Sequence, residues 1–263
     1  MKFPGVLSSE RPERDGQSGQ VEAESAIVLP IMTFLLLGLI QLGLLHQARI
    51  FTKYAAYRAV RTGALRNGKV DLMEKAAVAA ALPILAWSNG DAEVLGRTDT
   101  ASAWIQKWAK PGFGMMPTNR MKDFPALKYA EVKICGPTKS DVSGGTYDPG
   151  QELAAFDNYK ISSKGIKTKL RIQLVLNYRM IIPFANWVIH RMWRGERIVK
   201  ELHLDSRKIA VPDSKGDYVD HYGLYQAAAH MGIFVIPIKA HYSMKMHSDI
   251  PTEYLPDDDT VCD

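Results

Sequence analysis

Residues 25–48 contain no Asp, Glu, Lys or Arg, and residues 26–45 are almost entirely Leu, Ile, Val, Ala, Met, Phe and Gly. A helix rises about 1.5 Å per residue, so about twenty such residues cover the roughly 30 Å hydrocarbon layer of a membrane. The core helix of a soluble protein rarely runs this long without a polar face. Pro30 lies in the first turns, where a missing amide is tolerated or causes a modest kink. The segment therefore predicts a single transmembrane helix in a lipid bilayer.

The residues before this segment, MKFPGVLSSERPERDGQSG, are polar, charged and rich in turn formers. A secretory signal peptide has a short basic start, a short apolar core and a cleavage site after that core. The order here is reversed, because the polar stretch precedes an apolar core that is too long for a removable signal. We expect the apolar segment to stay in the mature protein.

Two acidic residues, Glu22 and Glu24, stand at the edge of the apolar segment. A carboxylate close to hydrocarbon is costly unless it is neutralised or paired. One interpretation is that both side chains only reach the lipid headgroups. The other depends on spacing: a cut after Gly19 would make Gln20 the first residue and Glu24 the fifth, which is the layout of a type IV prepilin processing site. The free amine of one subunit and this carboxylate of a neighbour could then neutralise each other during assembly.

The stretch from Gly19 to Leu65 resembles TadE-like proteins of the tight-adherence (Tad, type IVc) pilus system. The matching features are the small residue and the Glu before the apolar core, the AIVLP sequence of residues 26–30, the Leu-rich run with Gly38, and the Ala- and Arg-rich exit that ends at Gly63. The resemblance covers about the first quarter of the chain, with weaker echoes in the VLNYRMIIPF and IKAHYSMKMHSD segments.

This resemblance implies that Gly19 and Gln20 flank the prepilin-peptidase cut and that Glu24 is the subunit-assembly carboxylate. It also implies prepilin peptidase, other pilins or pseudopilins and the Tad assembly machinery as partners. The sequence departs from the family pattern at three places: Gln20 is not apolar, Glu22 is an additional acid, and Ser25 replaces the usual aromatic residue.

The distribution of basic residues conflicts with the topology that the leader implies. Three precede the span and six follow it: Lys2, Arg11 and Arg14, then Arg49, Lys53, Arg58, Arg61, Arg66 and Lys69. Charge counting alone places the C-terminus inside. A prepilin-like leader is processed on the cytoplasmic face, so we expect a single-pass protein of the bacterial inner membrane with a cytoplasmic N-terminus. The C-terminal domain is then periplasmic, or extracellular in a filament.

The expected organisation is a cytoplasmic leader peptide (1–19), a transmembrane and extended N-terminal helix (20–66) and a soluble α+β domain (67–263). The first helix should continue beyond the bilayer, because residues 46–65 contain no Pro and keep a helical spacing of apolar residues. Asp71 with Glu74 three positions later is a capping-box arrangement, and it predicts a second helix through the Ala-rich run to residue 87.

Alternating apolar and polar residues predict strands at 128–134, 169–177 and 238–247. Further helices are predicted around Trp104 and Trp108, after Pro183 with Phe184, Trp187 and Val188 apolar, and over about 218–230. Residues 110–125 and 135–150 are rich in Gly, Pro and other turn formers and are predicted to be loops. The sum is a pilin-like α+β fold, with a small antiparallel sheet packed on helices.

No residue pattern predicts an enzyme, a cofactor or a metal site. The histidines form no HExxH motif, and no GxSxG nucleophile elbow is present. His241 and His247 would share the polar face of one strand, which is more often plain surface than a metal pair. The net charge of +5 is spread through acid-containing segments, so nucleic-acid binding is not expected.

The chain has two cysteines, Cys135 and Cys262. In a domain outside the cytoplasm they could form one disulfide that ties the C-terminal tail to the body; otherwise they are two unpaired thiols. Two functions from different classes remain. The first is a TadE-like minor pilin or pseudopilin that takes part in pilus or secretion-apparatus assembly. The second is an uncleaved single-pass anchor that carries a periplasmic binding or scaffolding domain.

Overall fold

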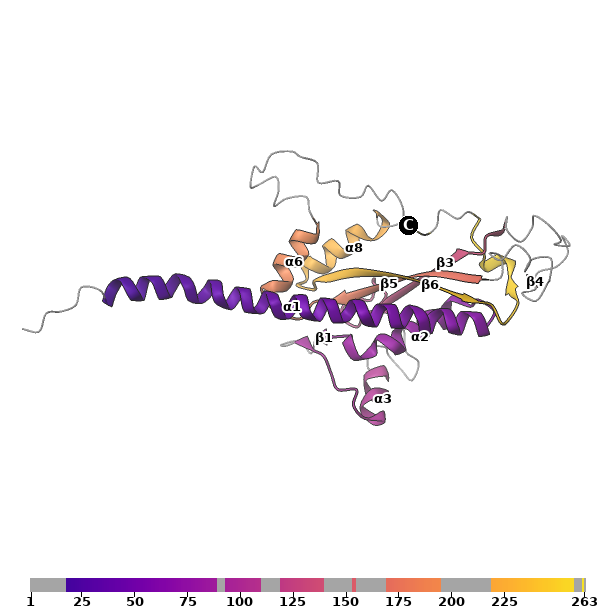
Figure 1. Cartoon of the computed structure of the whole chain (residues 1–263), viewed down its shortest axis with the longest axis horizontal. Helices are drawn as coiled ribbons and strands as arrows, with labels where there is room; N and C mark the ends of the chain where they lie inside the picture. Colours follow the sequence, from indigo (N-terminus) through magenta and orange to yellow (C-terminus); the bar gives the residue numbers. More distant parts are fainter. Residues whose placement is uncertain are drawn as a thin grey trace, which may run out of the picture.

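The computed structural model describes residues 18–88, 93–109, 119–139, 153–154, 169–194, 219–257 and 262. Its longest element is helix α1 (Ser18–Leu65), which is continuous through Pro30. The N-terminal half of α1 projects from the folded part of the molecule and the C-terminal half lies along it (Figure 1). Gln41 is the first buried residue of the helix. The prediction that the apolar helix continues into the soluble part is confirmed.

The centre of the folded part is a three-stranded antiparallel sheet of β3 (Ala130–Gly136), β5 (Lys169–Arg179) and β6 (Val235–Lys245), in the order β3-β5-β6. The three strands predicted from the sequence are therefore present. β6 begins three residues earlier than predicted and includes Pro237, which cannot donate a backbone hydrogen bond. An edge strand tolerates this residue.

Every second side chain of β5 faces the core. These side chains are Leu170, Ile172, Leu174, Leu176 and Tyr178, all of them buried. The C-terminal half of α1 packs against β5 and β6. Its contact face is built of small residues, namely Ala48, Ala55, Ala56, Ala59, Val60 and Ala64. Small side chains allow the helix backbone to approach the sheet closely.

Gly63 shows how close this approach is. A Cβ atom at this position would lie 2.3 Å from Sδ of Met73 and 2.9 Å from Cδ2 of Leu170. Met73 belongs to α2 (Val70–Ala81), which packs beside α1. Gly63 therefore allows α1 to contact α2 and the sheet at one point.

The start of α2 corrects the predicted capping box. The N-cap residue is Lys69, which makes no side-chain cap hydrogen bond, and Asp71 lies in the first turn, where it pairs with Lys75 at 2.8 Å. Glu74 is buried and accepts hydrogen bonds from Lys128 Nζ at 3.0 Å and from Asn119 Nδ2 at 2.9 Å. The helix was predicted correctly, but its second carboxylate joins α2 to the segment before β3 instead of capping the helix.

The prediction that α2 runs to residue 87 is wrong. The α-helix ends at Ala81 and a single turn of 3-10 helix, Leu82–Ile84, follows, because Pro83 has no amide and interrupts the helical hydrogen bonds. The chain then enters β1 (Trp87–Ser88), which pairs with β2 (Glu93–Val94).

The remaining elements are α3 (Ala101–Ala109), β4 (Leu153–Ala154), α6 (Ala185–Arg194), α8 (Val219–His230), β7 (Ile250–Pro251) and η2 (Thr252–Tyr254). In Figure 1, α6 and α8 lie on one side of α1, and α2 and α3 lie on the other. The rings of Trp104 and Trp108 stack on α3 with centroids 5.1 Å apart.

The predicted loops are partly inside the described residues. Residues 119–125 form no helix, while 110–118 and 140–150 lie outside the description. The predicted loop from residue 135 begins too early, since Cys135 and Gly136 belong to β3. With these corrections the α+β fold class is confirmed.

Candidate functional site

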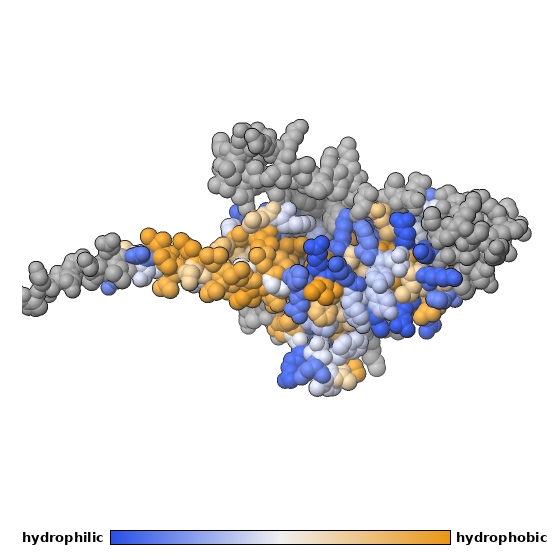
Figure 2. Space-filling view, in the orientation of Figure 1, coloured by the Kyte–Doolittle hydropathy of each residue, from blue (hydrophilic) through white to orange (hydrophobic). Residues whose placement is uncertain are grey.

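The free half of α1 is an apolar helix that its own chain does not cover. Residues 22–36 are all exposed, and large apolar side chains such as Ile27 and Leu39 are more than 60% accessible to solvent. Figure 2 shows this apolar surface along the projecting helix and onto the near end of the folded part. The helix is long and apolar enough to cross a membrane, and it suggests a membrane anchor.

The predicted processing and assembly residues lie at the free end of this helix. Gly19 and Gln20 belong to its first turn, and their side chains are outside the description. Glu24 is exposed, as is Glu22. Glu24 is seventeen residues from Gln41, or about 25 Å along the helix axis. The structure therefore keeps the predicted assembly carboxylate far from the folded domain and open to another molecule.

Gln41 joins the apolar helix to the domain. Its side chain is fully buried, and its Oε1 accepts a hydrogen bond of 3.0 Å from the backbone amide of Ile182. The contact lies inside the charge-free segment that predicted the membrane helix. An amide in an apolar setting is costly unless it is hydrogen-bonded, so this bond fixes where the domain meets α1.

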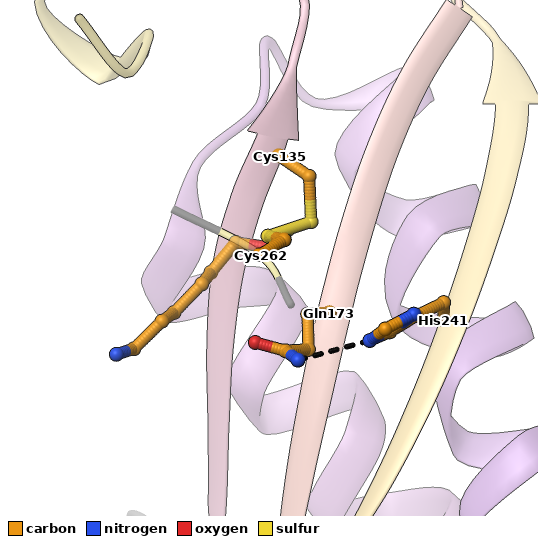
Figure 3. Close-up of a disulfide and its surroundings, with 5 residues drawn as sticks. Cys135, Gln173, His241 and Cys262 are labelled. Carbon is orange, nitrogen blue, oxygen red and sulfur yellow. Dashed lines mark hydrogen bonds between the residues drawn. A yellow bond between two sulfur atoms is a disulfide. The ribbon is translucent and has the colours of Figure 1, made fainter. Parts of the chain in front are cut away.

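At the other end of the domain, Cys135 on β3 and Cys262 are joined by a disulfide with Cα atoms 5.5 Å apart. The bond crosses 127 residues of sequence and fastens the C-terminal segment to the sheet. Figure 3 shows it beside Gln173 of β5 and His241 of β6, whose side-chain Nε2 atoms are 2.9 Å apart and hydrogen-bonded.

A pocket of about 520 Å³ adjoins the disulfide. Its described lining includes Arg171, His241, Ser243 and Cys262. Arg171 can donate hydrogen bonds, and His241 and Ser243 can donate and accept them, but among the described residues no group of three His, Cys, Asp or Glu could hold a metal ion.

The expectation that His241 and His247 share a strand face needs correction. β6 ends at Lys245, so His247 lies beyond it, where its backbone amide bonds to the Ala64 carbonyl at 3.0 Å. The strand is shorter here because the chain turns to reach the end of α1.

The fold and its free helix define a class, namely an α+β domain carried on a long apolar helix that suggests a membrane anchor and continues into the domain core. Within that class, the family described as TadE-like protein matches residues 19–61. The match confirms the resemblance stated from the sequence, and the N-terminal segment is TadE-like. It supports a role related to the Tad pilus. No curated protein and no solved structure matches the chain.

Sequence reasoning missed two polar contacts that connect distant parts of the chain. Gln41 is the only side-chain amide within residues 26–45, and this was a signal that the helix has a polar partner. The buried pairing of Glu74 with Lys128 and Asn119 had no such signal, because Glu74 fits a capping pattern and its partners are far away in the sequence.

Proposed function

We propose that this chain is a TadE-like minor pilin or pseudopilin that takes part in the assembly of a Tad (type IVc) pilus or a related secretion apparatus. It acts by assembly and not by catalysis. The observation that carries the proposal is the uncovered apolar half of α1, which lies within the TadE-like segment and presents Glu24 five residues after Gly19.

In this proposal prepilin peptidase cuts after Gly19 and leaves the amine of Gln20 at the start of α1. Lipid covers the free half of α1 while the protein is in the membrane, and neighbouring helices cover it once the protein joins an assembly. The exposed Glu24 of one subunit then neutralises the amine of another. An unpaired charge would be penalised, so this pairing fixes the axial position of each subunit.

The proposed location is the bacterial inner membrane, with a cytoplasmic N-terminus and a periplasmic domain. If the protein is incorporated into a filament, the domain is extracellular. The Cys135–Cys262 disulfide supports a domain outside the cytoplasm, where disulfides persist. The basic residues that follow the span favour the opposite orientation by charge counting, so the proposed orientation rests on the prepilin-like leader and on the disulfide.

The proposed processing is tested by the N-terminal sequence of the protein recovered from native membranes, measured by mass spectrometry. We expect a start at Gln20, and we expect that start to be lost in Gly19→Phe and retained in the control Gly16→Phe. An intact Met1 in the wild-type protein would reject processing and favour the alternative, an uncleaved single-pass anchor with a periplasmic binding or scaffolding domain.

A further inference from the structure

Helix α6 exposes several large apolar side chains on one face, although it belongs to the folded domain. We name its outer face by the residues Trp187, Val188, Arg191 and Met192, which recur at helical spacing, together with Phe184, which directly precedes the helix. Phe184 is 72% exposed, Met192 is 65% exposed and Trp187 is 45% exposed. The opposite side carries Asn186 and His190, which are 9% and 1% exposed. Large apolar side chains exposed together on one face fit an apolar environment outside the protein.

The position of α6 places this outer face at the level of the membrane. The Gln41–Ile182 hydrogen bond fixes the start of α6 beside the charge-free segment of α1. In Figure 1, α6 lies at the end of the folded part from which the free half of α1 emerges. The apolar surface is therefore continuous from the projecting helix to this end of the domain (Figure 2).

The length of the free helix supports the same placement. The apolar residues of α1 before Gln41 are 26–40, and as a helix they cover about 22 Å. A hydrocarbon layer of roughly 30 Å needs about five more residues. Those residues, 41–45, begin where Ile182 contacts α1. The start of α6 therefore lies within about 7 Å of the depth where hydrocarbon gives way to headgroups, on the hydrocarbon side.

The chemistry of the outer face fits this depth. Trp side chains are enriched at membrane interfaces, and Arg side chains reach from apolar surroundings to headgroup phosphates. The guanidinium of Arg191 lies 4.4 Å from the ring centre of Trp187, so one cation and one aromatic ring are presented together. Phe184 has a backbone φ of 64°, which is unfavourable for a bulky residue, and this conformation points to a role for its exposed ring.

We propose that the outer face of α6 is a second membrane contact, seated in the boundary between hydrocarbon and headgroups of the bilayer that α1 crosses. The inference rests on α1 being the membrane anchor, which the proposed function also requires, but not on processing at Gly19. The contact gives the domain two attachments to the bilayer and thereby fixes its tilt and its rotation about α1.

The test uses the full chain in liposomes of phosphatidylcholine and phosphatidylglycerol at a low protein-to-lipid ratio. A cysteine replaces Phe184, Leu36 or Ile105, one at a time, and carries an environment-sensitive fluorophore. The native cysteines are bonded to each other, so the new thiol is labelled selectively. All three positions are exposed, so the changes leave the core intact, and circular dichroism verifies folding. Leu36 reports the span, and Ile105 on α3 is the matched control for an exposed apolar residue.

We expect nitroxide lipids to quench the fluorescence of both the Leu36→Cys and the Phe184→Cys labels. A nitroxide near the lipid headgroup should quench the Phe184 label more, and a nitroxide near the end of the acyl chain should quench the Leu36 label more. Iodide should quench the Ile105→Cys label severalfold more than the other two. If iodide quenches the Phe184 label while lipid nitroxides quench the Leu36 label, α6 does not contact the membrane but α1 still does. An iodide-accessible Leu36 label overturns both. A Phe184 label shielded from both quenchers means that protein covers this position and also overturns the lipid contact.

Discussion

The side chain of Gln41 accepts a hydrogen bond from the backbone of Ile182, which is 141 residues later in the sequence, and this bond joins the membrane segment to the start of α6. Replacing Gln41 with Leu would keep the size of the side chain but leave the half-buried backbone amide of Ile182 without its acceptor. We expect this variant to lower the free energy of unfolding by about 1–3 kcal/mol. Denaturant titration in detergent measures the change. The control is Ile40→Leu at a neighbouring exposed position, and equal stability of the two variants would contradict the prediction.

Glu74 should matter far more to stability than Asp71, although both are acids at the start of α2. Glu74→Ala removes the acceptor shared by Lys128 and Asn119 in a buried position, and we expect a loss of about 1–3 kcal/mol. Asp71→Ala removes an exposed pair with Lys75, worth about 0.5 kcal/mol or less. Thermal unfolding of both variants gives the comparison. A larger effect of Asp71→Ala would restore the capping-box interpretation.

The disulfide should stabilise the domain by restricting the unfolded chain. Cys135→Ser is expected to lower the free energy of unfolding by about 2–4 kcal/mol, as estimated for bridges that close long loops. The double variant Cys135→Ser with Cys262→Ser should match the single one, because the lost constraint and not a free thiol causes the effect. Alkylation of protein from native membranes without reductant should modify neither cysteine, and modification of both would contradict the bond.

Lys107 gives the domain a pH-dependent contribution to stability. Its ammonium group is buried and donates to the carbonyls of Pro83 at 3.3 Å and Leu95 at 2.5 Å. Burial lowers the pKa of Lys107 from 10.5 to about 8. Between these pH values the unfolded chain binds more protons than the folded one, so this residue's contribution to stability rises as pH increases from 8 to 10.5.

The measurement for Lys107 is the free energy of unfolding across that pH range in the wild type and in Lys107→Met. We expect the difference between the two proteins to move in favour of the wild type as pH rises. The control is Lys75→Met at the surface, which should show a flat difference. A flat difference for Lys107→Met as well would mean that its ammonium group is not destabilised by burial.

Glu24 should be required for assembly and Glu22 should not. Glu24→Gln removes the charge that neutralises a neighbour's amine in the proposed function, so we expect the variant to reach the membrane normally but to be depleted severalfold from purified assemblies. Glu22→Gln has the same chemistry two residues away and serves as the control. Wild-type incorporation of Glu24→Gln would count directly against the proposed pairing.

The elements that sequence reasoning predicted well are those with a strong period. The charge-free run defined α1, and alternation in β5 located the central strand to within two residues, because the core-facing positions carry apolar residues and most positions between them carry polar ones. β6 was placed three residues late because Pro237 interrupts the hydrogen-bonding pattern that a strand normally requires, and only its position at the sheet edge makes that residue acceptable.

Sequence reasoning could name candidate site residues only where they are defined by local spacing. Gly19, Gln20 and Glu24 are defined by spacing, and the family match covers them. The face of α6 that is exposed was not predictable, since the order of Phe184, Trp187 and buried His190 fits a core helix equally well. The packing of α6 on the sheet and the contact of Ile182 with α1 decide which side of α6 is exposed. Both depend on residues that are far from α6 in the sequence.

The continuity of α1 has a mechanical consequence. Force applied along its free half pulls the packed half parallel to the sheet, so the contacts from Gln41 to Ala64 bear the load together and must yield together. Force applied across the helix would instead peel it from the domain one turn at a time. Force along the helix axis is therefore resisted by all the contacts of the packed half. Force across the axis is resisted only by the turn of the packed half that is nearest to the free half.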